Sequence, residues 1–213
     1  MHVRSIALTA TGLMLAATAA NAQRRSLALH PTFGIQGGAN FAQLGGEGVA
    51  NTSNRTGFNG GVYLGLPATS SLEVRLELLY SQEGTKSSSG TGTLKMDYLR
   101  LPVLFRYAFP TKSGARPFFA VGPSLGVQIK CNVEGSDGGV TASASCDDVV
   151  GDQNKKTFDL SGKVEGGVDF KSSQRTFSLG GAYSYGFTDT FDTGSAGAHP
   201  KNRVWSIFAA FGI

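Results

Sequence analysis

The chain has 213 residues, of which 30 are glycine, 10% are aromatic and only 16% are charged. About a quarter of the residues are charged in a typical soluble domain, and disordered chains contain few aromatics, so the composition fits neither class. The net charge of +4 is small and the basic residues are scattered along the chain, which excludes a recognisable nucleic-acid-binding pattern.

The N-terminus has the pattern of a cleavable export signal. Arg4 supplies a positive start, residues 6–19 are apolar or small, and an A-x-A cleavage site follows at 20–22. A transmembrane anchor is the alternative, but the apolar core is short and rich in Ala and Thr. No later stretch approaches the roughly 20 apolar residues of a membrane helix. We therefore expect a signal peptide over 1–22 and one domain over 23–213.

The mature chain repeats a two-residue alternation of apolar and polar side chains. In the segment 72–78 every even position is Leu or Val, and the odd positions are Glu73, Arg75 and Glu77. Because successive side chains on a strand point to opposite faces, this alternation indicates strands with one apolar and one polar face. Eight strands are predicted, at 33–41, 56–66, 72–82, 94–109, 117–130, 157–170, 176–187 and 203–213. Most have the roughly 9–11 residues that a tilted strand needs to cross a bilayer.

The segments between these strands alternate in length. Short turns are expected at 67–71, 110–115 and 171–175, and long polar loops at 42–55, 83–93, 131–156 and 188–202. Short turns on one rim and long loops on the other are typical of an outer-membrane barrel. The predicted fold is all-β: an eight-stranded, antiparallel, up-and-down transmembrane β-barrel.

The direction of the apolar face separates a membrane barrel from a soluble, lipocalin-like one. The apolar face carries the bulky side chains, whereas the polar face is rich in Gly, Ala and Ser. Since the interior of an eight-stranded barrel is only just wide enough for side chains to fill, the bulky face should point outward to lipid. Aromatic residues gather near strand ends, as in interfacial girdles, although a general preference of aromatics for strands is an alternative explanation.

The polar face carries both signs of charge, and we expect these side chains to form a paired network in the lumen. Buried charges persist when they are paired and hydrogen-bonded. Such a network would fill the narrow interior, and a small pore is the alternative. The predicted network comprises Glu73, Arg75, Glu77, Arg100, Arg106, Lys130, Lys163 and Glu165.

Two irregularities fall in the middle of the predicted barrel. The apolar phase slips between Tyr98 and Leu99, which predicts a bulge in this strand. Pro102 and Pro123 each remove a ladder donor, and they lie at similar distances from the 110–115 turn. We expect them to face neighbouring ladder positions and to share one local defect.

Both cysteines, Cys131 and Cys146, lie in one polar loop. In an exported chain a close pair favours a disulfide; two free thiols or a metal pair are the alternatives, and no histidine lies nearby to complete a metal site. The same 131–156 loop is acidic, but its spacing matches no EF-hand, so no metal or other cofactor is predicted.

Residues that could form a catalytic site are few. Beyond the signal segment the histidines are His30 and His199. A hydrolase triad would need a nucleophile and an acid beside His199. Asp189, Asp192 and Ser195 lie in the same loop, but any polar loop offers such residues, and a solvated histidine is the simpler interpretation. No enzyme activity is predicted.

Three segments resemble a known family. Residues 98–107, YLRLPVLFRY, resemble the Y-L-x-I-P-x-L-x-K-Y strand of PorT-like and related outer-membrane β-barrel domain proteins, and 117–126 resemble the P-Y-x-x-x-G-P-x-x-G strand that follows it there. Residues 34–41 are similar to the family's opening G-x-K-x-G-x-N strand. The final residue, Ile213, departs from the usual aromatic end. The resemblance implies an integral outer-membrane barrel and suggests, from PorT-type members, a role in protein secretion.

These observations predict a non-enzymatic protein of the bacterial outer membrane with a structural or interaction role. A narrow pore or transporter, a secretion-associated barrel and a lipid-modifying enzyme are the alternatives. The expected contacts are outer-membrane lipid, the barrel-assembly machinery during biogenesis, and an envelope or extracellular protein. No nucleic-acid partner is expected, and the chain is expected to be a monomer.

Overall fold

The computed structural model describes residues 30–137, 140–146, 148, 156–172, 175–191 and 198–213. The predicted signal peptide over 1–22 lies outside the described residues. Helices that are long and apolar enough to cross a bilayer are absent from the described part of the chain.

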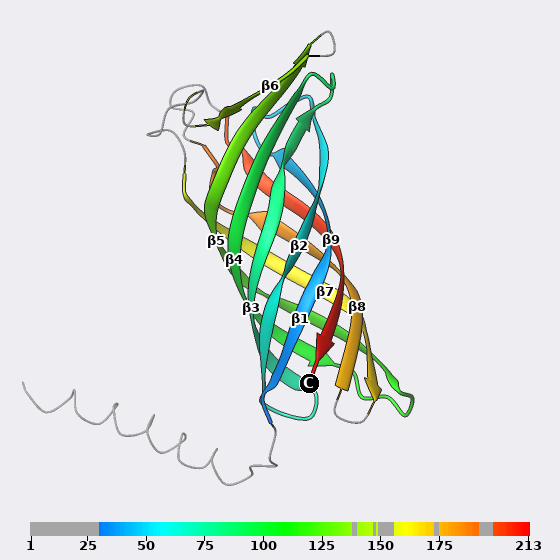
Figure 1. Ribbon diagram of the computed structural model, residues 1–213. Helices are drawn as coiled ribbons and strands as arrows, with labels where there is room; N and C mark the ends of the chain where they lie inside the picture. Colours follow the sequence, from blue (N-terminus) through cyan, green and yellow to red (C-terminus); the bar gives the residue numbers. More distant parts are fainter. Residues whose placement is uncertain (1–29, 138–139, 147, 149–155, 173–174, 192–197) are drawn as a thin grey trace, which may run out of the picture. The chain divides into compact units, whose positions relative to one another are not determined.

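Residues 31–213 form one compact unit with nine strands in its described residues (Figure 1). The strands are β1 (Thr32–Gly45), β2 (Thr52–Pro67), β3 (Leu72–Ser87), β4 (Gly92–Ala108), β5 (Ala115–Asp137), β6 (Val140–Ser145), β7 (Phe158–Ser172), β8 (Arg175–Gly186) and β9 (Lys201–Gly212). Eight of them pair antiparallel in the order β1-β2-β3-β4-β5-β7-β8-β9, and β9 closes on β1. The predicted eight-stranded antiparallel barrel is confirmed. The short strand β6, which pairs with β5, was not predicted.

The two rims of the barrel differ in their connections. We call the rim that carries the β2–β3, β4–β5 and β7–β8 connections the turn rim, and the opposite one the loop rim. The C-terminus lies at the turn rim, where the backbones of Phe33 and Ile213 hydrogen-bond to each other (Figure 1). At the loop rim the strands run further than predicted: β3 ends at Ser87 and β5 at Asp137. The apolar alternation stops where the outer face leaves lipid, but backbone pairing continues, so the pattern placed these strand ends too early.

The apolar face of the barrel points outward. Ile35, Trp205 and Ile207 are each 60% or more exposed, whereas Glu77 and Asp159 are buried. A soluble barrel would bury the first set, so this orientation describes a lipid-facing wall. Aromatic ring contacts occur near both rims, in the pairs Phe58–Tyr80, Tyr183–Trp205, Tyr107–Phe109 and Phe170–Phe177.

The predicted bulge lies on the neighbouring strand. Asp97 of β4 pairs with Lys130 of β5. The next residue, Tyr98, pairs with Gln128, so Ile129 of β5 is the extra residue. The inner face of β4 keeps one phase, with Tyr98 fully buried, so the bulge predicted within β4 was wrong. The bulge also leaves Lys130 exposed, so its predicted place in the lumen network was wrong too.

The two prolines lie at neighbouring ladder positions, as predicted, but each interrupts a different ladder. Pro102 pairs with Ser124, and the β4–β5 ladder resumes at Phe105 and Val121, so the position facing Pro123 is skipped. The ladder that breaks at Pro102 is β3–β4, which passes from the Leu76–Val103 pair directly to Leu79–Arg100. A proline has no backbone N–H to donate, so each proline removes a hydrogen bond to the strand that its nitrogen faces. The predicted single shared defect was therefore wrong: the prolines interrupt the two ladders on either side of β4.

Candidate functional site

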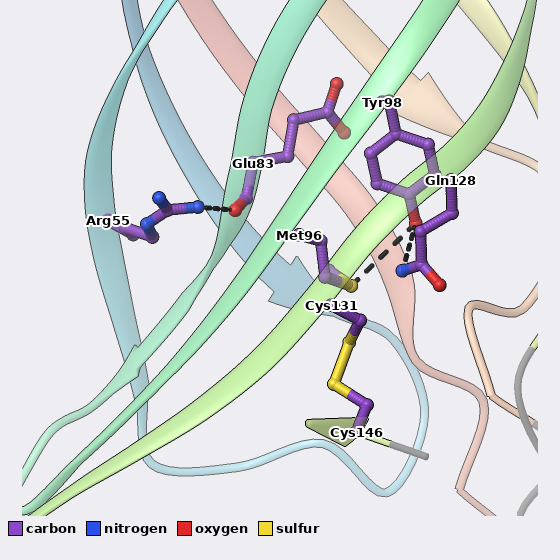
Figure 2. Close-up of a disulfide and its surroundings, with 7 residues drawn as sticks. All are labelled: Arg55, Glu83, Met96, Tyr98, Gln128, Cys131 and Cys146. Atoms are coloured by element: carbon purple, nitrogen blue, oxygen red, sulfur yellow. Dashed lines mark hydrogen bonds between the residues drawn. A yellow bond between two sulfur atoms is a disulfide. The ribbon is translucent and has the colours of Figure 1, made fainter. Parts of the chain in front are cut away.

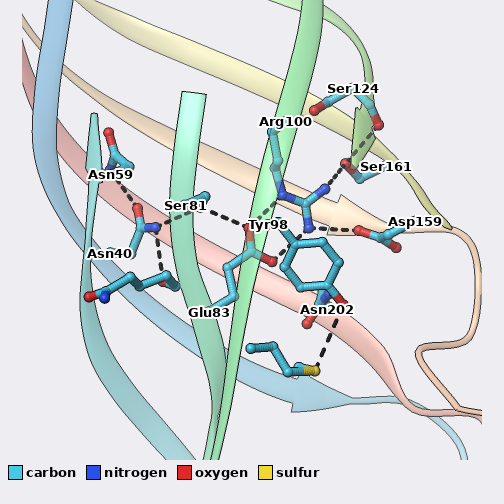
Figure 3. A network of polar contacts seen from close by, with 12 residues as sticks. Asn40, Asn59, Ser81, Glu83, Tyr98, Arg100, Ser124, Asp159, Ser161 and Asn202 are labelled. Atoms are coloured by element: carbon cyan, nitrogen blue, oxygen red, sulfur yellow. Dashed lines mark hydrogen bonds and ion pairs between the residues drawn. The ribbon is translucent and has the colours of Figure 1, made fainter. Parts of the chain in front are cut away.

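The largest cluster of charged side chains lies in the lumen and centres on Arg100 of β4. Its Nε donates to Glu83 Oε1 over 2.5 Å, and its Nη2 donates to Glu83 Oε2 over 2.6 Å (Figure 3). Nη2 also donates to Asp159 Oδ2 of β7 over 2.7 Å. The planar guanidinium thus joins carboxylates from two other strands, and all three side chains are buried.

Neutral side chains continue this network toward β1 and β2. Ser81 Oγ donates to Glu83 Oε1 over 2.9 Å, and Asn40 Nδ2 of β1 donates to Ser81 Oγ over 2.9 Å (Figure 3). Asn40 Oδ1 accepts from Asn59 Nδ2 of β2 over 2.6 Å and from Ser206 Oγ of β9 over 2.7 Å. With Asp159 of β7 at its far end, the network crosses the lumen from wall to wall.

A second layer of charge lies around Lys163 of β7. Its Nζ lies 2.7 Å from Glu77 Oε2 of β3 and 2.7 Å from Glu165 Oε1 of the same strand. Two carboxylates therefore share one ammonium, and all three groups are buried. This layer ties β3 to β7 across the lumen.

A third layer lies nearer the turn rim. Arg106 Nη2 donates to Asp169 Oδ1 over 2.5 Å, and Ser178 Oγ donates to the same oxygen over 2.7 Å. Arg75 Nε lies 3.0 Å from Glu73 Oε1. The layers follow one another down the barrel, so charge fills the lumen over most of its length.

Each end of the lumen is closed by apolar side chains. Toward the turn rim, the guanidinium of Arg75 lies 4.1 Å from the ring centroid of Tyr63, and that of Arg106 lies 3.9 Å from the centroid of Phe118. Phe208 completes this buried cluster with three alanines. The rings cover the cations and shield them from water.

Toward the loop rim the closure is a disulfide with its apolar neighbours. Cys131 of β5 and Cys146 are bonded, with their Cα atoms 5.4 Å apart (Figure 2). The bridge packs with Met96, Tyr98 and Leu44 in one buried cluster. Tyr98 also bonds to the polar wall, because its hydroxyl accepts a hydrogen bond from Gln128 Nε2 over 3.4 Å. The disulfide thus forms part of the lid over the charged layers.

Between the two closures, a cavity of about 30 Å³ lies among the central side chains, lined in part by Gln36, Asn40, Glu83 and Lys163. A buried water needs about 10–15 Å³ by the same measure, so about two waters fit. The buried Gln36 Oε1 has no hydrogen-bond partner among the described residues and can accept a hydrogen bond from one of them.

The structure brings most of the predicted lumen residues together and adds others. On the inner face it places Glu73, Arg75, Glu77, Arg100, Arg106, Lys163 and Glu165. Glu83 was missed because the third strand was predicted to end at 82, although the inward positions Ser81, Glu83 and Thr85 continue the two-residue period.

At the loop rim His199 Nδ1 lies 2.9 Å from Asp189 Oδ2. This hydrogen bond holds the pKa of the Asp189 carboxyl below its usual range. The backbone N–H of His199 donates to the Glu47 carbonyl, so the pair ties two connections of the loop rim together. The other residues considered for a triad, Asp192 and Ser195, lie outside the described residues. Clusters of three metal-binding side chains are absent from the described part of the chain.

Comparison with known proteins assigns the fold. The family model of the outer membrane protein beta-barrel domain matches residues 20–192. The chain matches no curated protein. It is similar to the crystal structure of Neisserial surface protein A, with a TM-score of 0.52 and 16% identity over 85% of this chain and 96% of that chain.

Two further solved structures are similar at lower scores. OprG from Pseudomonas aeruginosa has a TM-score of 0.47 and 17% identity over 85% of this chain and 94% of its own. Ail, the attachment invasion locus protein of Yersinia pestis, has a TM-score of 0.45 and 15% identity over 87% of this chain and 100% of its own. At such identities the likeness concerns the fold alone.

Proposed function

Because the chain belongs to the outer membrane protein beta-barrel domain family, we propose that it is a non-enzymatic integral protein of the bacterial outer membrane that acts through its outward surface. The observation that carries this proposal is the filled lumen. Three layers of paired charge lie between two apolar closures, and the central cavity of about 30 Å³ is far too small for a solute path.

The same contacts support a structural rather than a conducting role for the charges. In the interior of an eight-stranded barrel there is room for side chains but not for a channel. Arg100 and Lys163 each bind two carboxylates, so moving either cation out of the way would leave buried charges without a partner. A path for ions would require these layers to open together.

Recording in planar bilayers tests this proposal. The folded chain should give no steady single-channel steps, because paired charged side chains occupy the lumen in three layers. Heat-modifiable gel mobility of the same preparation is the control that the barrel is folded when it is added. Steady, ion-selective steps from folded protein would contradict the proposal and favour a pore.

The hairpin β5–β6 is the best-presented interaction surface at the loop rim. β6 pairs with β5 along one edge, and its residues 141–144 are exposed, small and uncharged. The Cys131–Cys146 disulfide fixes the base of the hairpin (Figure 2). An edge of this kind fits an extended segment of an envelope or extracellular protein, which would add as a further strand.

Surface labelling tests whether the hairpin faces outward. In intact cells a bulky, membrane-impermeant maleimide should label Ser143→Cys, since long connections of outer-membrane barrels face outward. The matched control is Thr111→Cys in the exposed β4–β5 turn, which should react only after the outer membrane is permeabilised. The reverse labelling would place the hairpin in the periplasm and remove this role.

The strand motifs support a more specific proposal about the subfamily and its role in secretion. The proline strands around Pro102 and Pro123 support a place in the PorT-like branch and, with it, a role beside a secretion apparatus. The lipid-facing wall supports insertion by the barrel-assembly machinery, and the closed barrel supports a monomer. Co-isolation of the chain with secretion components, lost when the hairpin residues are replaced, would test the secretion role.

A further inference from the structure

An arginine on the outer surface of β9 is the starting point of this inference. Arg203 is exposed and faces outward. It lies on the same face as Trp205, two residues closer to the loop rim. Its cross-strand neighbours are Gln43 of β1 and Tyr185 of β8. Among the described residues no acidic side chain lies within ion-pair distance of Arg203, in contrast to the paired cations of the lumen.

The guanidinium of Arg203 is held in place on two sides. Its Cζ lies 5.6 Å from the ring centroid of Tyr185 on one neighbouring strand. On the other neighbouring strand it lies over Gly45, where a Cβ would be only 2.7 Å from Cζ. A side chain at position 45 would therefore displace the guanidinium, so the glycine leaves the room that it occupies. A charged group fixed in this way loses little rotamer freedom when it binds a ligand.

The height of Arg203 on the barrel matches the edge of the apolar band. Ten residue steps separate it from Ile213 at the turn rim. At about 3.4 Å per residue and a strand tilt of about 40°, these steps rise about 25 Å, which is the height of the lipid-facing band. Below Arg203 the rings of Tyr183 and Trp205 lie 4.6 Å apart, as expected for an interfacial girdle. Arg203 thus lies where lipid headgroups begin.

The surroundings of Arg203 are basic. Lys201 lies two residues further toward the loop rim on the same outward face. Lys156 is exposed at the same rim, where its backbone N–H donates to the Thr190 carbonyl. Both lysines act electrostatically on Asp189, which is already hydrogen-bonded to His199. Guanidinium and ammonium groups together are the usual protein ligands of phosphate esters.

We propose that Arg203, with Lys201, binds the phosphate ester on the headgroup of an outer-leaflet glycolipid of the lipid A type. The inference rests on the proposed outward orientation of the loop rim. It deepens the proposed role by naming one ligand of the outer surface, and it involves no bond making or breaking. The lipid's acyl chains would lie below, along the wall formed by Trp205 and Ile207.

Native mass spectrometry of the folded full chain, titrated with diphosphorylated lipid A, tests the inference. Native protein should bind this lipid at least about tenfold more tightly than the same lipid after removal of its phosphates. Arg203→Gln should lose about tenfold in affinity, whereas Arg203→Lys should lose less. The matched control is Arg175→Gln, which removes an exposed arginine from β8 at the turn rim and should change nothing.

A second variant tests the positioning without changing the charge. Gly45→Val should displace the guanidinium and weaken lipid A binding while Arg203 is still present. Heat-modifiable mobility shows for each variant that the barrel is folded.

Equal affinity for both lipid forms, or equal losses for Arg203→Gln and Arg175→Gln, would overturn the inference. Inorganic phosphate that competes at the same concentration as lipid A would reduce the site to a general anion site and overturn the lipid assignment. If the chain shows no phosphate-dependent binding of lipid A and also gives no single-channel steps in planar bilayers, this inference alone is wrong and the proposed function stands.

Discussion

Arg100 lies between two carboxylates from different strands, Glu83 of β3 and Asp159 of β7. Arg100→Ala would leave both carboxylates buried without a cation, which costs about 3–5 kcal/mol in comparable buried pairs. Urea unfolding of the barrel in lipid vesicles measures this loss. The matched control, Arg175→Ala, removes an exposed arginine and should change the free energy of unfolding by no more than about 0.5 kcal/mol. Equal effects of the two substitutions would contradict the network.

For individual residues, most of the side chains that face the lumen could be predicted from the sequence. The two-residue period and the limited interior volume of a small barrel apply to every strand. Glu77, Arg106 and Lys163 follow directly from these two rules. Lys130 does not, because one extra residue at Ile129 turns it outward and nothing in the local composition announces a bulge. The partners of each charge also depend on which strands face each other across the lumen, which the sequence pattern does not contain.

Among the structural elements, the β4–β5 pair is interrupted at Pro123 and has little room for change beside it. A Cβ at Gly122 would lie 1.9 Å from the carbonyl oxygen of Val103, which belongs to the backbone of the neighbouring strand. Gly122→Ala should therefore destabilise the barrel by about 1–3 kcal/mol, since the backbone must shift. The control is Gly166→Ala on β7, where the nearest atom is 3.8 Å away. Urea midpoints that fall equally for both variants would argue against this close approach.

The disulfide joins the barrel wall to the end of the hairpin, because Cys131 lies on β5 and pairs with Met96 of β4, whereas Cys146 follows β6. It closes a sequence separation of 15 residues, for which the chain-entropy model gives about 3 kcal/mol. Replacing both Cys131 and Cys146 by serine should leave the barrel heat-modifiable but expose the hairpin to proteinase K, with cuts mapped between 131 and 156. Native protein that is cut there at the same rate would show that the bridge does not hold the hairpin.

The ends of the strands and the apolar cluster that closes the loop rim were harder to predict than the strands of the barrel wall. Met96 and Tyr98 are apolar or aromatic, yet both are fully buried on the inner face. The rule that apolar side chains face lipid holds only within the bilayer. Above it, an inward apolar side chain can pack on the disulfide instead, and the alternation alone does not distinguish the two environments.

For the molecule as a whole, the closed barrel could be predicted because strand count, loop alternation and side-chain volume all agree. The ligand and partner could not, because they depend on single outward residues such as Arg203 and on the edge of β6, which carry no periodic signal. The charged lumen explains how the barrel is held together. Its outer surface is where we expect the protein to act.

Cell fractionation combined with heat-modifiable gel mobility tests the central claim most directly, that the apolar face meets lipid and the charged face fills the lumen. The chain should appear in the outer-membrane fraction and migrate differently with and without boiling, because the closed barrel resists detergent at room temperature. A soluble periplasmic protein whose mobility does not depend on heating would contradict the account.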